Sequence, residues 1–303
     1  MRHCAFLTMD NLEEFVVYDH LLYEPLRQRG WEVTEVPWRD PDPRWERFEA
    51  VVIRTPWDYQ DDPGAFMEVL REIDASPARL ENRLELVEWN ISKRYLRDME
   101  RRGVPTVPTL WPCAGDRDLP AEADAGAWRA WIRGWAQELD TDELILKPLV
   151  SANADHTYRV RVSADPVVEL PDGLRKSFAG LPFLVQPFVK NIISEGEYSL
   201  FYFGESYSHT ILKTPKSGDF RVQEEHGGRL KLVQEPETAL REAAERAMEF
   251  IRPQPLYSRI DFVRMEDGRF ALMELELIEP SLYFNMDPAS PERFAEVFAA
   301  WMD

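Results

Sequence analysis

The first 85 residues alternate short apolar runs with one amphipathic stretch, a pattern typical of an open α/β sheet. Apolar runs predict buried strands at residues 4–9, 31–36 and 50–53. Between the first two runs, apolar residues recur at helical spacing from Leu12 to Leu26, and Gly30 ends the predicted helix. A helical crossover of this length makes the strands that it joins parallel.

The rest of the chain mixes predicted helices with paired strands, which indicates an α+β arrangement. A helix is expected from Asn90, as its N-cap, to Arg102. The other expected elements are helices at about 124–138 and 237–251, strands at 143–150 and 181–189, and strand pairs from residue 196 onward. The last helix carries apolar residues at i, i+3, i+4 and i+7, which indicates core packing: Phe294, Val297, Phe298 and Trp301.

The strand at 50–53 runs directly into the segment RTPWDY at 54–59. Loops at the carboxyl ends of strands in open α/β sheets are where ligands bind, so this segment is a candidate site. A turn set by proline, with Trp57 packed as a lid on the core, explains the same residues, and both interpretations stay open.

The segment at 257–280 predicts a two-stranded hairpin with acidic residues on one face. Asp267-Gly268 is a strong signal for a two-residue turn, which would pair Glu266 with Arg269. In that register the following carboxylates share one patch: Asp261, Glu274 directly opposite it, and Glu276 two residues along the strand. Like charges directly opposite one another destabilise a sheet, and oxygen ligands on rigid strands are typical of magnesium sites that also bind phosphates. An exposed acidic face is the alternative.

Several basic or small residues could bind phosphates, although a surface lysine or a polar loop explains each one singly. Lys93 lies in the first turn of a predicted helix, where a cation opposes the helix dipole. Lys147 ends an apolar strand, and the loop after it has small residues at 151–154. Between Glu205 and Gln223 the charge balance reverses, with three cations: Lys213, Lys216 and Arg221.

Composition narrows the classes of partner. The 303 residues include 36 Lys and Arg against 55 Asp and Glu, a net charge of −19, so nucleic acid and anionic membranes are not expected as main partners. With 44% hydrophobic residues the chain can form a packed core. Cys4 and Cys113 match no disulfide or metal-ligand spacing, and no stretch approaches ~20 apolar residues, so we expect a cytoplasmic protein.

Taken in order, these segments resemble the ATP-grasp ligases of the glutathione synthetase-like group. The resemblance covers essentially the whole chain through Lys93, ILKP, VQPFV at 185–189, EGEYSLFYF at 195–203, LKTPKSGDFRVQEEHGG at 212–228, RIDFV and MELELIEPS. RTPWDY, KPLVSANADHTYR and EEHGG are similar to the branch with the cyclo-ligase that closes D-cycloserine. The resemblance implies an N-terminal open α/β domain at 1–88 and two α+β lobes that grip ATP, at 89–188 with a lid and 189–303 with the metal site.

The resemblance also implies roles for individual residues. Lys93, Lys147 and the loop from Ser151 would contact the nucleotide phosphates. Gln186 and Val189 would form the hinge whose backbone meets the adenine, and Glu197 or Glu195 would bind the ribose. Arg221 would face the transferred phosphoryl group with Lys213 near it, and Asp261, Glu274 and Glu276 would hold Mg²⁺. Two departures from the family pattern stand out: Glu276 where many members have Asn, and Ser151 to Ala154 where many have glycines.

The implied reaction is phosphorylation of a small carboxylate by ATP to an acyl phosphate, which an amine or a related nucleophile attacks with release of ADP and phosphate. The substrate side is expected at Thr55, Trp57, Asp58 and Tyr59, where Asp58 could hold an amino group. The family further suggests a homodimer or homotetramer. Two alternatives stay open: a kinase that phosphorylates a hydroxyl group, and a nucleotide-binding protein without turnover.

Overall fold

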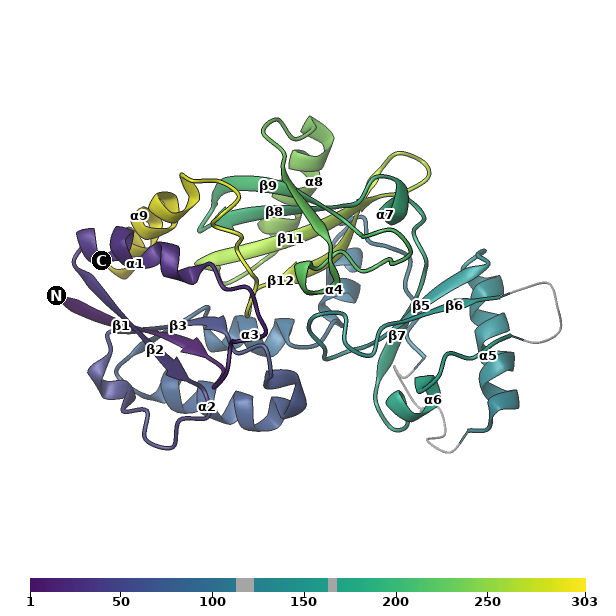
Figure 1. Cartoon of the computed structure of the whole chain (residues 1–303), viewed down its shortest axis with the longest axis horizontal. Coiled ribbons are helices and arrows are strands. Elements are labelled where there is room, and N and C mark those ends of the chain that lie inside the picture. The colour runs from purple at the N-terminus through teal and green to yellow at the C-terminus, as the bar shows by residue number, and fades with distance from the viewer. Residues whose placement is uncertain (113–122, 163–167) are drawn as a thin grey trace. The chain divides into compact units, whose positions relative to one another are not determined.

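The computed structural model describes residues 1–112, 123–162 and 168–303, so Cys113 lies outside the described residues. The chain divides into two compact units. Unit 1 contains Met1–Pro105 and Asn191–Asp303, and unit 2 contains Thr106–Lys190 (Figure 1). The predicted division into three domains, at 1–88, 89–188 and 189–303, stays a prediction. In the structure most of the predicted first and third domains belong to the same compact unit.

Unit 1 begins with the open parallel sheet that the sequence predicts. Four strands lie in the order β2-β1-β3-β4: β1 (Arg2–Thr8), β2 (Trp31–Pro37), β3 (Ala50–Thr55) and β4 (Arg79–Glu81). The connections include η1 (Asp19–Leu22), α1 (Tyr23–Gln28), η2 (Trp45–Arg47), η3 (Tyr59–Asp61) and α2 (Pro63–Ala75). The predicted single helix from Leu12 to Leu26 is wrong in its first half. Residues 9–18 form no helix, although their apolar side chains recur at helical spacing.

The predicted helix at 90–102 is two helices, α3 (Leu84–Asn90) and α4 (Tyr95–Arg101). Asn90 ends α3 and is not an N-cap. Its side-chain amide donates to the carbonyl of Leu275 at 2.9 Å and accepts from the amide of Leu277 at 3.0 Å. The side chain of Asn90 therefore holds the backbone at Leu275 and Leu277, at the end of β12 (Phe270–Glu276), which lies far away in the sequence.

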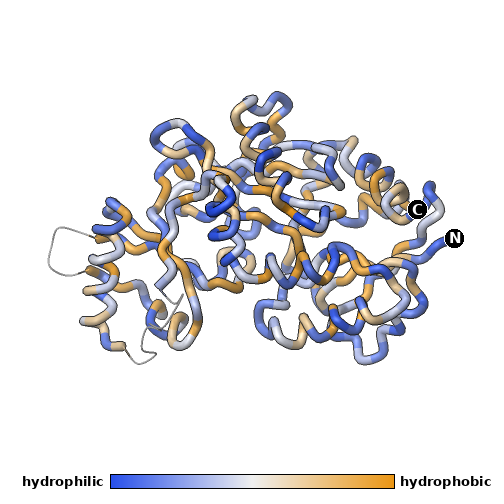
Figure 2. The backbone as a smooth tube through the Cα atoms, turned by 180° about the vertical axis from the view of Figure 1, so that it is seen from behind, coloured by the Kyte–Doolittle hydropathy of each residue, from blue (hydrophilic) through white to orange (hydrophobic). Residues whose placement is uncertain are grey.

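The second sheet of unit 1 has five strands in the order β10-β9-β8-β11-β12. Their bounds are β8 (Glu197–Phe203), β9 (Ser206–Thr214), β10 (Arg229–Leu232), β11 (Tyr257–Arg264) and β12 (Phe270–Glu276), all paired antiparallel. The helical elements are α7 (Asn191–Ser194), η4 (Glu224–His226), α8 (Thr238–Glu249) and α9 (Ser290–Met302). Hydrophobic and hydrophilic stretches alternate along the backbone (Figure 2).

One hydrophobic core joins both sheets of unit 1. Phe6 and Trp31 of the parallel sheet belong to the same cluster as Phe201 of β8, and α9 completes it. Phe298 of α9 meets Trp31 edge to face, with ring centroids 4.9 Å apart. The apolar face predicted for the last helix is confirmed as core, and it couples the N-terminal sheet to the hairpin sheet that carries the acidic residues.

Unit 2 is a small sheet covered by one long helix. The strands lie in the order β6-β5-β7, with β5 (Glu143–Pro148), β6 (Tyr158–Arg161) and β7 (Phe183–Pro187), beside α5 (Ala125–Glu138) and α6 (Leu174–Ser177). Its core is aromatic: the indole of Trp128 on α5 lies near parallel to the ring of Phe183, with centroids 5.8 Å apart. The predicted helix at 124–138 and the strands at 143–150 and 181–189 are confirmed, with shorter strands than predicted.

Candidate active site

The β11–β12 hairpin of unit 1 places Asp261 opposite Glu274, as the sequence predicts. The turn itself differs from the prediction, because the amide of Met265 donates to the carbonyl of Arg269 and three residues close the loop instead of two. Gly268, in the left-handed region at φ 83°, ends that loop. A register shift after Asp261 leaves Met273 without a partner and restores the predicted pairing. The two deviations cancel, so the acidic residues meet as expected although Glu266 does not pair with Arg269.

Three carboxylates form one tight group. Asp261, Glu274 and Glu276 each offer an oxygen, and these atoms all lie within 4.8 Å of one another. Asp261 is 1% exposed and sits at the bottom of the group. Ser199 on the neighbouring strand β8 donates its hydroxyl hydrogen to Asp261. Closely spaced oxygens held on paired strands fit a hard divalent cation such as Mg²⁺.

Three buried cations surround these carboxylates. The guanidinium of Arg259 lies 3.1 Å from Asp261 and also bonds Glu276, which is its cross-strand partner. The ammonium of Lys213 lies 2.6 Å from Glu197 and 3.3 Å from Asp261. The ammonium of Lys93, between α3 and α4, lies 2.9 Å from Glu274. In this structure the partner of Lys93 is a carboxylate of the acidic group, and its contact with phosphate stays a prediction.

The pKa values in the group reflect burial and neighbouring charge. Burial, with the like charges of Asp261 and Glu274, raises the pKa of Glu276 to about 8, although Arg259 opposes the shift. Burial also raises the pKa of Glu197, against the attraction of Lys213. Burial acts on Asp261 in the same direction, but Arg259 and Lys213 outweigh it and hold the pKa of that carboxyl below its usual value. The group thus favours additional positive charge.

Of the two glutamates predicted for the ribose, only Glu197 is linked by ion pairs to the three carboxylates, through Lys213. Glu195 accepts bonds from the guanidinium of Arg264 at 3.0 Å and from the hydroxyl of Tyr198 at 2.8 Å. Glu197 bonds Lys213, which in turn bonds Asp261. The two glutamates thus have different partners, and which of them meets the ribose stays a prediction.

Arg221, predicted to face the transferred phosphoryl group, lies in the loop after β9. Its guanidinium forms a two-point contact with Asp219, with distances of 3.1 and 2.8 Å. Within the described residues, no ion pair joins Arg221 to the three carboxylates. Arg259 is the arginine that pairs with two of the three carboxylates, Asp261 and Glu276, and sequence reasoning missed it. The predicted register already put it opposite Glu276 at the site face, so the signal was present.

The segment predicted for the substrate side surrounds a buried carboxylate that sequence reasoning also missed. Trp57 donates its indole hydrogen to the backbone carbonyl of Glu279 at 2.9 Å and packs against Phe15, with the two rings tilted at 43°. The hydroxyl of Tyr59 lies beside the carboxyl group of Glu279 and opposes the rise that burial causes in its pKa. Thr55 is buried at the end of β3. The packing interpretation holds for Trp57, while the segment as a whole lies at the edge of the acidic group.

Asp58 makes contacts that fix it in place. It accepts a bond from the indole of Trp38 at 2.7 Å and forms an ion pair with Arg39. Glu279 carries no sequence signal, because it lies beyond the end of β12, where the alternation of the strand stops.

Unit 2 holds the remaining predicted residues. Lys147 lies in β5, opposite Leu184 of β7, and is 8% exposed. On β7, the side-chain amide of Gln186 donates to the hydroxyl of Thr109 at 2.9 Å. Val189, just after that strand, is buried. Lys147 and Gln186 thus lie on adjacent strands, and Val189 follows the second of them. The side chain of Gln186 is bonded to Thr109, which leaves its backbone for the predicted adenine contact.

The loop from Ser151 has no glycine at 151–154, where many members of the family have glycines. Asn153 and Ala154 both take left-handed backbone conformations, with φ of 51° and 56°. Such conformations favour glycine and occur in non-glycine residues mainly where the surrounding structure imposes them. The loop therefore takes a backbone conformation that favours glycine without containing one.

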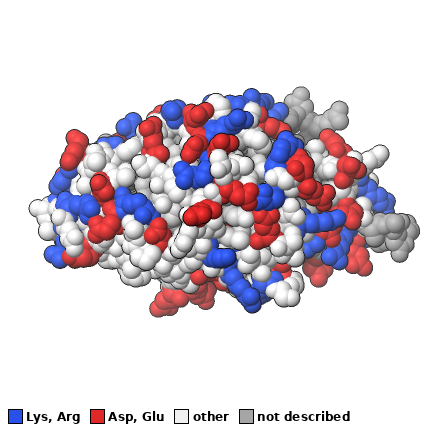
Figure 3. Space-filling model, turned by 90° about the horizontal axis from the view of Figure 1, so that it is seen from above, with Lys and Arg blue, Asp and Glu red and all other residues white. Residues whose placement is uncertain are grey.

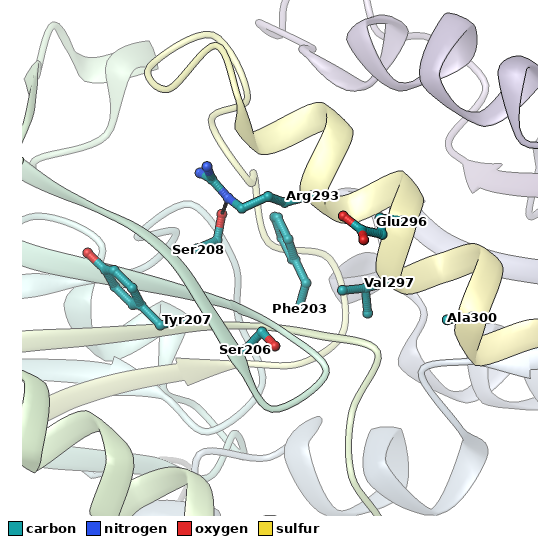
Figure 4. Close-up of a pocket in the computed structure, with 8 residues that line it drawn as sticks. All are labelled: Phe203, Ser206, Tyr207, Ser208, Arg293, Glu296, Val297 and Ala300. Atoms are coloured by element: carbon teal, nitrogen blue, oxygen red, sulfur yellow. Dashed lines mark hydrogen bonds between the residues drawn. The ribbon is translucent and has the colours of Figure 1, made fainter.

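A hollow of about 400 Å³ lies elsewhere in unit 1, between the β8–β9 turn and α9 (Figure 4). Arg293 reaches across it and donates to the hydroxyl of Ser208 at 3.2 Å. No residue that lines the hollow belongs to the acidic group. On the face seen in Figure 3, acidic and basic side chains are interspersed, and no broad basic patch is visible. In the described part of the chain, no helix is long and apolar enough to cross a membrane.

Residues 4–82 match the family model of the N-terminal domain of D-cycloserine synthetase DcsG. The cycloserine biosynthesis protein DcsG of Streptomyces lavendulae is 30% identical over 285 residues, which cover 92% of this chain and 91% of that relative. The crystal structure of D-cycloserine synthetase DcsG matches with a TM-score of 0.82 at 26% identity, over 99% of this chain and 100% of that one. The ATP-grasp ligase PsnB, solved with a minimal precursor, Mg and ADP, has a TM-score of 0.62 at 13% identity, over 99% and 98%. The predicted ATP-grasp fold is confirmed.

Proposed function

The chain belongs to the DcsG family of ATP-grasp ligases, which are enzymes that form carbon–nitrogen bonds, and we propose that it does so by activating a small carboxylate with ATP. The observation that supports this proposal is the group of Asp261, Glu274 and Glu276. These carboxylates would hold a magnesium ion, which together with the neighbouring buried cations would neutralise the charge of the transferred phosphate. The substrate is proposed to be amino-acid-like, since cycloserine is itself a cyclic derivative of serine.

The residues present fit a magnesium ion. Three carboxylate oxygens within 4.8 Å suit it, and the raised pKa of Glu276 marks an excess of negative charge that a cation would relieve. Asp261, Glu274 and Glu276 would hold the ion. When bound, it would bridge and neutralise phosphate oxygens.

The basic residues carry the electrostatic part of catalysis. Arg259 and Lys213 lie against Asp261, so phosphate oxygens that approach the carboxylates would meet their fixed positive charges. Lys93 is positioned by Glu274 in the same way. Following the resemblance, Lys147, Ser151, Gln186 and Val189 bind the nucleotide, Glu197 the ribose, and Arg221 the transferred phosphoryl group, and these assignments belong to the proposal.

The chemistry proceeds in two substitutions. A carboxylate oxygen of the substrate attacks the γ-phosphorus of ATP, and ADP leaves with the electrons of the broken bond. The amine nitrogen then attacks the acyl carbon, loses a proton, and phosphate departs with the carboxylate oxygen. The site must hold the two reactants in line and keep water from the mixed anhydride. A cytoplasmic location and a dimeric or tetrameric assembly stay predictions.

Product analysis tests the proposal. The protein is incubated with Mg·ATP, a pool of amino acids and small carboxylates, and hydroxylamine as a trapping nucleophile. We expect ADP and phosphate with a hydroxamate, because an acyl phosphate is electrophilic at carbon. A stable phosphorylated product without free phosphate would instead show a kinase. AMP with pyrophosphate would contradict the proposed route, and no nucleotide turnover with any acid would indicate a binding protein.

A further inference from the structure

Glu279 is a buried carboxylate at the rim of the acidic group, with contacts to the segment at 54–59. It follows β12 by three residues and is 9% exposed, so it is nearly buried but not sealed from solvent. Its backbone carbonyl accepts a hydrogen bond from the indole of Trp57 at 2.9 Å, and the hydroxyl of Tyr59 lies beside its carboxyl group. Tyr59 is 3% exposed and packs against Phe66, with ring centroids 5.0 Å apart. The position of Glu279 is thus set from two sides.

Glu279 differs from the other acidic residues of the site in its charge partners. Asp261, Glu274, Glu276 and Glu197 each form an ion pair with a lysine or arginine. Among the ion pairs of the described residues, none includes Glu279. Burial raises its pKa to about 7, and Glu274 adds to the shift, while Tyr59 and Lys93 oppose it. A carboxylate has room for about four hydrogen bonds, and Tyr59 and a backbone N–H are the neighbours that lower the pKa of Glu279 as hydrogen-bond donors.

Asp58, the residue that the sequence suggested for an amino group, already has its partners. Arg39 supplies it with a cation and Trp38 with a hydrogen bond. Binding of a substrate ammonium at Asp58 would have to displace Arg39. Binding at Glu279 displaces no ion pair and supplies the charge that the site lacks.

We propose that Glu279, oriented by Tyr59, binds the ammonium group of an amino-acid substrate and thereby selects amino acids over acids that lack this group. The inference rests on the proposed function and names the substrate class of that site. The substrate would place its ammonium at Glu279, and its carboxylate would reach toward the side where Lys93 and Glu274 lie. Glu279 is a specificity residue, because it acts on a group that does not react when the carboxylate is phosphorylated.

The test compares matched acids. Wild type, Glu279→Gln and Tyr59→Phe are each incubated with Mg·ATP, hydroxylamine and one of two pools of acids. One pool contains both enantiomers of 2-amino acids, and the other contains the corresponding 2-hydroxy acids. Glu279→Gln keeps the shape and removes the charge, and Tyr59→Phe keeps the packed ring. Glu242→Gln, an exposed residue on α8, controls for a change of charge alone. Hydroxamates are identified by mass spectrometry, and ADP release gives the rates.

We expect wild type to prefer amino acids, and Glu279→Gln to lose about 10- to 100-fold in kcat/KM for them through a higher KM. Its rate with hydroxy acids and its KM for Mg·ATP should stay within about twofold of wild type. Tyr59→Phe should show a smaller loss in the same direction.

An unchanged preference in Glu279→Gln, or its loss in Asp58→Asn instead, would overturn the assignment and leave the ligase function standing. A loss that is equal for both pools would show a merely structural role and would also overturn it. If wild type forms hydroxamate from neither pool, the proposed function fails and this inference with it.

Discussion

Glu274→Gln is the substitution that separates the metal role of the acidic group from its structural role. Glu274 pairs with Lys93 at 2.9 Å, and its side chain is 28% exposed. Glutamine keeps the size and an oxygen that can accept from Lys93, but removes one of three negative charges. The charge also lies directly opposite Asp261, where like charges repel. The weaker attraction to Lys93 and the weaker repulsion from Asp261 offset one another, so we expect the unliganded protein to keep its fold.

The effect on Mg·ATP binding follows from linkage. At 100 times its dissociation constant, a ligand that binds only the native state stabilises it by ~2.7 kcal/mol. Loss of one charged ligand should weaken binding by at least about 10-fold, which is about 1.4 kcal/mol. At an unchanged concentration the stabilisation of the variant therefore falls to about 1.4 kcal/mol or less. Since ~1 kcal/mol shifts Tm by roughly 2–4 °C in a domain of this size class, the Tm rise should shrink to about half or less.

Two measurements check this expectation. Thermal unfolding with and without Mg·ATP gives the shift, and ADP release at limiting Mg²⁺ gives the turnover, which should fall by at least about 100-fold because the bound ion also neutralises charge in the transition state. Glu242→Gln should behave as wild type in both. A Glu274→Gln protein with the wild-type Tm rise and the wild-type turnover at limiting Mg²⁺ would refute the metal assignment.

Three further outcomes are expected. Lys147→Ala should blunt the Tm rise that Mg·ATP produces, because it removes a proposed phosphate contact, and a rise equal to that of wild type would argue against that contact. Arg221→Ala should lower kcat far more than it weakens ATP binding, since a contact made mainly in the transition state raises kcat and not affinity; an unchanged kcat would leave its pairing with Asp219 as its whole role. Burial lowers the pKa of His209 from its ordinary value of 6.5 to about 4. Between these two values the unfolded chain therefore binds a proton that the folded chain does not. Between pH 7 and pH 5 the unfolding free energy of wild type should thus fall by ~2 kcal/mol through this residue. His209→Phe, which keeps a ring against Phe201, should lose less in urea unfolding at the two pH values, and an equal loss would contradict the assignment.

The position of the three carboxylates could be predicted because strand alternation and a turn signal act locally. The pairing of Asp261 with Glu274 needs only the hairpin register. Even there the details were wrong, since a three-residue turn and an unpaired Met273 compensate each other. A bulge has no composition that marks it, so its place could not be predicted.

Other features depended on tertiary contacts that periodicity does not contain. Asn90 is a residue type that often begins helices, but here it is the last residue of α3. Its side-chain amide donates to the backbone carbonyl of Leu275 instead of capping a helix. The apolar residues at 9–18 recur at helical spacing and form no helix. Glu279 lies beyond its strand, and only the fold brings Trp57 and Tyr59 to it. The alternation of a strand therefore could not indicate Glu279, whereas it did place Asp261, Glu274 and Glu276 on one face.

The most direct test of the central claim follows the oxygen atoms. A carboxylic acid that yields hydroxamate is labelled with ¹⁸O in its carboxylate and incubated with the enzyme, Mg·ATP and an amine. If the carboxylate is activated as an acyl phosphate, one labelled oxygen must leave with phosphorus, and mass spectrometry of the released phosphate should show one ¹⁸O per product formed. Phosphate that carries no label, at full product yield, would contradict the account.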